Sequence, residues 1–196
     1  MGIYLTKLSQ LGLSPWAALA DGLDIITGLG FGYVTQLIGV VVMAFSMIVF
    51  RTKIGIGTIL NVLLVGLILE LYEVIYPALP QELWLQIIVF VVGLLLMTFG
   101  RSLYISSALG QGPRDGLFVG LARTTKFEVK YIKLAIEFVV FIIGFGLGGK
   151  IGVGTILTVV FSGYLVQFYF KLLHYDPKTS VQYSIIDYMK KKDPSM

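Results

Sequence analysis

The chain has 196 residues, of which 57% are hydrophobic and only 13% are charged. A water-soluble domain of this size cannot hide so much apolar surface, so the composition predicts an integral membrane protein. The formal net charge of +4 lies mainly in loops and at the end of the chain, which is typical of membrane topology and contact with anionic lipid rather than of nucleic-acid binding. The absence of cysteine excludes disulfides and thiolate metal sites.

Long uncharged runs predict helices that cross a hydrocarbon core of ~30 Å, which takes about 20 residues. These runs cover residues 31–50, 54–69, 83–99, 138–149 and 151–170. The run from residue 138 is short unless its helix begins near Val129. A helix that begins there places Glu137 inside the membrane.

The two halves of the chain repeat each other at a spacing of about 97 residues. The octet KIGIGTIL at residues 53–60 returns as KIGVGTIL at 150–157, and Gly12 and Pro15 recur as Gly110 and Pro113. We therefore expect repeat 1 at residues 1–80, repeat 2 at 81–175 and a basic cytoplasmic tail at 176–196. The tail is either a short amphipathic helix on the membrane surface or disordered.

Each half reads as a helix, a Gly/Pro turn, a short helix, a second helix, a Gly-rich turn and a third helix. In the second half these segments cover 83–107, 110–113, 114–124, 129–147, 148–154 and 155–173. The first half lacks most of its opening helix, because Gly2 is the counterpart of Gly100 and only Met1 precedes it. In the Gly-rich turns, Thr58 and Thr155 are predicted to cap the third helices, and the glycines to permit close helix approach.

The short helix at 114–124 decides the predicted topology. With about eleven residues it reaches only about half-way through a bilayer, so it is expected to be re-entrant or interfacial. Three crossings per half then invert the second repeat relative to the first. Positive-inside counting favours this arrangement over parallel repeats, because Arg51, Arg123 and Lys126 fall on the side of the C-terminal tail, while the linker at 73–84 has no Lys or Arg.

The two Gly/Pro turns break the helices where a solute site is expected. Backbone that leaves a helix inside a membrane is tolerated only where protein or a water-filled cavity surrounds it. The N-terminus of the following short helix offers free N–H groups and a partial positive charge, which favour an anionic or polar solute. The predicted substrate-binding residues are Pro15, Trp16, Gly112, Pro113, Arg114, Asp115 and Glu137.

Glu137 is the least expected residue of this set, because a charge at the centre of a membrane helix costs ~2.5 to 3.5 kcal/mol on translocon scales. Two interpretations stay open. Glu137 faces the site near Arg114 and Asp115 and binds a cation or a proton, or it pairs with Arg114 or Lys133 and fixes the short helix. Arg101, at the end of the preceding helix, is expected to extend its charge to the membrane surface.

The segments GLSPWAALADGL at residue 12 and GQGPRDGLFVGLART at residue 110, with AIEFVV and LGGKIGVGTIL, resemble the bacterial YczE/YyaS/YitT-type membrane proteins, most closely the YczE-like branch. The resemblance covers nearly the whole chain to about residue 173. It implies a multi-pass protein of the bacterial plasma membrane, with a cytoplasmic C-terminus on the charge count above. The family usually has an acidic residue where this chain has Ala17, and its activity is unassigned.

The favoured function is a secondary transporter or permease for a small anionic or polar solute, with its site between the short helices. The alternative is a non-transporting accessory or scaffold protein that binds another membrane protein or a lipid, and oligomers are compatible with either. No enzyme activity, cofactor or metal site is predicted, because the sequence has no motif that combines a catalytic nucleophile with a general base and no metal-ligand motif.

Overall fold

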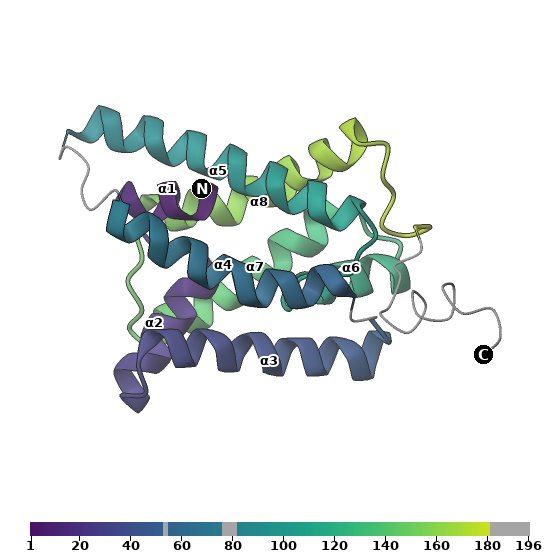
Figure 1. The fold of residues 1–196 in the computed structure, drawn as a ribbon, viewed down its shortest axis with the longest axis horizontal. Coiled ribbons are helices and arrows are strands. Elements are labelled where there is room, and N and C mark those ends of the chain that lie inside the picture. Colours follow the sequence, from purple (N-terminus) through teal and green to yellow (C-terminus); the bar gives the residue numbers. More distant parts are fainter. Residues whose placement is uncertain (53–54, 76–81, 181–196) are drawn as a thin grey trace.

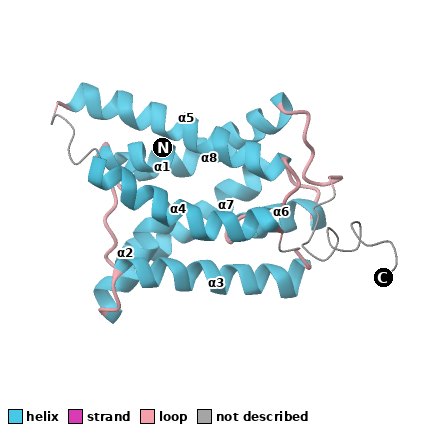
Figure 2. Cartoon of the chain, viewed as in Figure 1, coloured by secondary structure: helices cyan, strands magenta, loops and turns pink. Residues whose placement is uncertain are grey.

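The computed structural model describes residues 1–52, 55–75 and 82–180. These described residues form α-helices joined by loops and turns, without a strand (Figures 1 and 2). The helices are α1 Gly2–Leu8, α2 Pro15–Thr27, α3 Phe31–Phe50, α4 Ile56–Ile75, α5 Leu83–Ser106, α6 Asp115–Thr124, α7 Val129–Gly146 and α8 Val153–Leu172. The predicted all-helical class is confirmed, and short helices follow both Gly/Pro turns.

Among the described residues, three helices are long and apolar enough to cross a membrane: α3, α5 and α8. Helix α7 has 18 residues and carries Lys130, Lys133 and Glu137, which lowers its apolar character. Helix α1 has seven residues. Of the predicted tail at 176–196, the structure describes residues 176–180. The lysines at 190–192 lie outside the described residues.

The long helices lie side by side along the longest axis of the molecule (Figure 1). Helix α5 contacts α1 and α8, while α7 contacts α8. Each short helix bridges two long helices: α2 contacts α3 and α7, and α6 contacts α7 and α3. Each short helix therefore packs against a long helix from its own half of the chain and another from the other half.

Glycines allow the close approach between α2 and α7. A Cβ atom on Gly144 would lie 2.8 Å from the Leu19 nitrogen, and one on Gly149, just beyond α7, would lie 2.0 Å from the Ala18 carbonyl oxygen. Small residues at such contacts let helix backbones meet where lipid gives no hydrophobic driving force. The contact between these two parts of the chain thus depends on glycine at positions 144 and 149.

The largest buried cluster surrounds α6. It joins four helices through Ile105, Phe118, Val119, Ala122, Val129, Ile132, Val166 and Phe170. A smaller cluster, Ala20, Val34 and Ile38, joins α2 to α3. Large apolar side chains also cover the outside, where Ile48 is 80% exposed and Phe145 66%. An apolar exterior of this kind fits contact with lipid.

Candidate functional site

The first helix break, at residues 10–14, docks on the start of α8. Gly12 has a φ of +125°, and a Cβ at this residue would lie 2.6 Å from the Gly152 nitrogen, so only glycine fits. The Gly154 N–H donates to the Leu11 carbonyl oxygen at 2.7 Å, and the Thr155 hydroxyl donates to the Leu13 carbonyl oxygen at 2.6 Å. The non-helical carbonyls of the break are thereby satisfied within the protein.

The second break, at residues 108–112, docks on the start of α4 in the same way. The Gly57 N–H donates to the Leu109 carbonyl oxygen at 2.8 Å, and the Thr58 hydroxyl donates to the Gln111 carbonyl oxygen at 2.6 Å. Gly110 has a φ of +109°, and a Cβ there would lie 2.6 Å from the Gly55 Cα. Each break is therefore held by the Gly-x-Gly-Thr segment of the other half.

These contacts refine the prediction for the two threonines. The Thr155 hydroxyl accepts the N–H of Gly152, the N-cap of α8, at 3.1 Å, which confirms its capping role. The Thr58 hydroxyl likewise accepts the Gly55 N–H at 3.3 Å. The sequence did not reveal that both hydroxyls also donate to a remote break. The glycines beside these threonines allow the remote break to approach closely. The sequence had instead predicted that they allow two helices to approach each other.

Arg114 lies where the two halves meet. It precedes the first residue of α6, and its guanidinium stands 5.3 Å from the centroid of the Trp16 ring on α2. Its Nη2 donates to the Thr35 carbonyl oxygen on α3 at 3.1 Å. Of the predicted residues, the structure therefore brings Trp16 and Arg114 together, and each directly follows a proline, Pro15 or Pro113.

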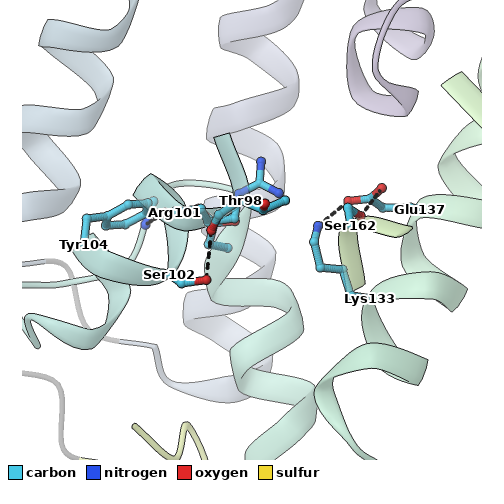
Figure 3. Close-up of polar contacts among 9 residues, drawn as sticks. Thr98, Arg101, Ser102, Tyr104, Lys133, Glu137 and Ser162 are labelled. Carbon is cyan, nitrogen blue, oxygen red and sulfur yellow. Dashed lines mark hydrogen bonds and ion pairs between the residues drawn. The ribbon is translucent and has the colours of Figure 1, made fainter. Parts of the chain in front are cut away.

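Asp115, in the first turn of α6, is held by two residues of α5. The Arg101 Nε lies 3.4 Å from Asp115 Oδ1, and the Tyr104 hydroxyl donates to Asp115 Oδ2. The Gly112 N–H donates to the Tyr104 oxygen at 3.0 Å. In Figure 3, Arg101 and Tyr104 lie apart from the group formed by Lys133, Glu137 and Ser162. The expectation that Arg101 only extends toward the membrane surface is wrong, because it pairs with Asp115.

Glu137 belongs to a separate buried group on α7 and α8. Lys133, one helical turn before it, donates to Glu137 Oε1, and the Ser162 hydroxyl donates to Oε2 at 2.9 Å (Figure 3). The Lys133 and Glu137 side chains are only 5% and 3% exposed. Of the predicted partners, the structure has Lys133, and no described hydrogen bond or ion pair joins Glu137 to Arg114 or Asp115.

Several partners of the predicted residues were not foreseen from the sequence: Arg101, Tyr104, Thr35 and Ser162. One signal was available for Ser162. Thr155, Thr158 and Ser162 recur at helical spacing in an apolar run, and all three are buried on one face of α8. Polar residues at that spacing in a membrane helix indicate the face that contacts other polar groups.

Comparisons with known proteins agree with this membrane architecture. Residues 1–171 match a family described as "Family of unknown function (DUF6198)". The chain belongs to this family. It is 35% identical over 168 residues to the "Uncharacterized membrane protein YczE" of Bacillus subtilis, with 85% of this chain and 78% of that protein covered.

Two further relatives extend the comparison. An "Uncharacterized protein" of Haemophilus influenzae is 35% identical over 173 residues, covering 88% of this chain and 78% of the relative. The "Uncharacterized protein YyaS" of Bacillus subtilis is 29% identical over 175 residues, covering 88% and 87%. The predicted kinship to YczE and YyaS is confirmed, and no function is assigned to these relatives. No solved structure matches the chain.

Proposed function

We propose that this DUF6198 protein is a secondary transporter or permease for a small anionic or polar solute, with the site between the short helices, where Trp16 of α2 meets Arg114 at the start of α6. The observation that carries the proposal is the environment of Arg114. Its contacts are a backbone carbonyl and an aromatic ring, and no described carboxylate forms an ion pair with it. A partly buried guanidinium without an anionic partner offers its charge to a solute.

The architecture we propose is a pair of inverted repeats at residues 1–80 and 81–175. The reciprocal contacts support it: break one is held by the start of α8, and break two by the start of α4. Equivalent helices α3 and α7 run in opposite directions along the long axis in Figure 1, as inversion requires. In inverted-repeat transporters the solute site lies near the midplane between such broken segments.

The proposed protein is a multi-pass component of the bacterial plasma membrane with a cytoplasmic C-terminus, and it has no enzymatic role. In this arrangement the ends of the helices that carry Arg51 and Arg123 face the cytoplasm. Pro113, Arg114 and Asp115 are partly buried at the start of α6, which contacts α3 and α7, and this supports a site between these helices. Pro15 and Trp16 approach the same region from α2.

A thermal-shift screen of the detergent-solubilised protein against small anions, amino acids and metabolites tests the proposal. A solute at a hundred times its dissociation constant stabilises the folded state by about 2.7 kcal/mol. We expect such a solute to raise the Tm of the parent but not of Arg114→Ala. Lys126→Ala, which removes an exposed charge of the same sign, is the matched control and keeps the shift. A solute that stabilises Arg114→Ala as well as the parent contradicts the proposed site.

The second candidate function is an accessory or scaffold protein that binds a membrane protein or a lipid. It is favoured by the closed pairing of Lys133 with Glu137 and of Arg101 with Asp115, which needs no solvent pathway. Hydration separates the two functions. Because the chain has no cysteine, Ser162→Cys introduces a single reactive thiol beside Glu137. A small water-soluble thiol reagent is expected to modify it only if a water pathway reaches Glu137 and Lys133.

A further inference from the structure

A small cavity lies between the last turns of α3 and the second break. Its volume is about 10 Å³, enough for about one water-sized particle. The walls are formed by Met43, Ser46, Met47, Thr52, Thr58, Gln111, Gly112, Pro113 and Gly116. No lysine, arginine or histidine contributes to these walls.

The oxygen atoms around this cavity act as acceptors. Gln111 is 4% exposed, and its Oε1 is buried without a hydrogen-bond partner. The Ser46 hydroxyl already donates its hydrogen to the Val42 carbonyl at 2.8 Å, and the Thr58 hydroxyl donates to the Gln111 carbonyl at 2.6 Å. These three groups therefore have only lone pairs left to offer, and a buried acceptor without a partner is costly.

The ends of two helices meet at the cavity. Gly112, Pro113 and Gly116 lie at the start of α6, where the helix dipole places partial positive charge. The cavity lies beside the C-terminal end of α3, where the helix dipole places partial negative charge. Asp115 directly precedes Gly116 in the wall, although Arg101 pairs with it. Because the two dipoles oppose each other, the preference for a hard monovalent cation comes from the neutral acceptor oxygens in the walls.

We propose that this cavity binds one dehydrated alkali-metal cation, such as Na⁺, through Gln111 Oε1 and the hydroxyl oxygens of Ser46, Thr58 and Thr52. The cation links α3 of the first half to the second break. The site does not rest on the transport proposal, because a cation that fixes this junction stabilises a scaffold as well as a permease. Its test therefore uses cations alone, without any solute.

Gly116 provides a sharp variant. A Cβ at this position would lie 3.5 Å from Gln111 Oε1, from Thr52 Oγ1 and from Ser46 Cβ, which is ordinary contact distance. Gly116→Ala is thus accommodated in the helix and fills space in the cavity. The matched control is Gly100→Ala, since no atom lies within 4 Å of a Cβ at that helical glycine.

The experiment measures Tm in detergent while N-methylglucamine chloride is replaced by LiCl, NaCl or KCl at constant ionic strength. We expect at least one alkali cation to raise the Tm of the parent and of Gly100→Ala in a saturable manner. Gly116→Ala should lose this rise. Gln111→Met, which removes the side-chain oxygen at similar size, should lose it too and covers the case in which Gly116→Ala does not fold.

Two outcomes overturn the proposal. If the Tm of the parent is the same in N-methylglucamine as in every alkali cation, the cavity holds water only. If the saturable rise persists in Gly116→Ala or in Gln111→Met, the cation binds elsewhere.

Discussion

Glu137 illustrates how a buried charged side chain is accommodated in an apolar helical protein. Lys133 donates to one of its carboxylate oxygens and Ser162 to the other, so both oxygens have a partner and the charge is balanced within one helical turn. Such a pair adds little net stability compared with apolar residues, but the loss of one member leaves a buried charge without a partner. The group is therefore sensitive to single substitutions and tolerant of a double one.

We predict that Lys133→Met and Glu137→Leu each lower the free energy of unfolding by about 3–5 kcal/mol, the usual cost of breaking a buried ion pair. The double variant should lose much less than the sum of the two, because no charge is left unpaired. Denaturation of the three variants in the same detergent measures these differences. Additive losses would show that the pairing contributes nothing and that the two side chains act separately.

The sequence predicted which charged residues matter better than it predicted the side chains and carbonyls that these residues contact. Glu137, Arg114 and Asp115 stood out because charge is rare in apolar segments, and the Lys133 partner followed from its spacing of four residues. The Arg114 partners could not be predicted, because Thr35 is 79 residues away in the chain. Contacts over such separations depend on helix packing, which spacing along one helix does not encode.

At the scale of elements, the two breaks connect the two halves of the chain. Both were predicted from their glycine and proline residues, since unsatisfied backbone inside a membrane needs a protein partner. What the sequence did not reveal is that the partners are exchanged between halves. The Thr155 hydroxyl meets a carbonyl 142 residues away, and the Thr58 hydroxyl meets one 53 residues away. The octet repeat signalled equivalent elements but not which break each one holds.

We predict that Thr58→Val and Thr155→Val destabilise the protein by similar amounts, about 1–3 kcal/mol each. Valine keeps the shape but leaves buried backbone groups without their hydrogen bonds. Thr27→Val is the matched control, because its exposed hydroxyl bonds only within α2. Unfolding in detergent compares the three variants. A loss confined to one of the two threonines, or one equal to that of the control, would contradict equivalent docking of the breaks.

Across the whole molecule, several hydroxyl side chains are buried, while large apolar side chains cover much of the outside. Thr98, Ser102, Thr155, Thr158 and Ser162 are buried, whereas Ile48 and Phe145 are among the most exposed residues. An apolar exterior could be expected from the composition. The number of crossings could not, because the short helices α2 and α6 decide it and their depth depends on packing against α7 and α3.

The proposed function depends most heavily on the proposed inversion of the two halves. Arg51 and Lys150 are exposed residues in the equivalent turns before α4 and α8. Because the chain has no cysteine, Arg51→Cys and Lys150→Cys can each be labelled alone in intact cells with a membrane-impermeant maleimide. We predict that Lys150→Cys reacts from outside and that Arg51→Cys reacts only after permeabilisation. Labelling of both positions from the same face would contradict the inverted arrangement and the solute site built on it.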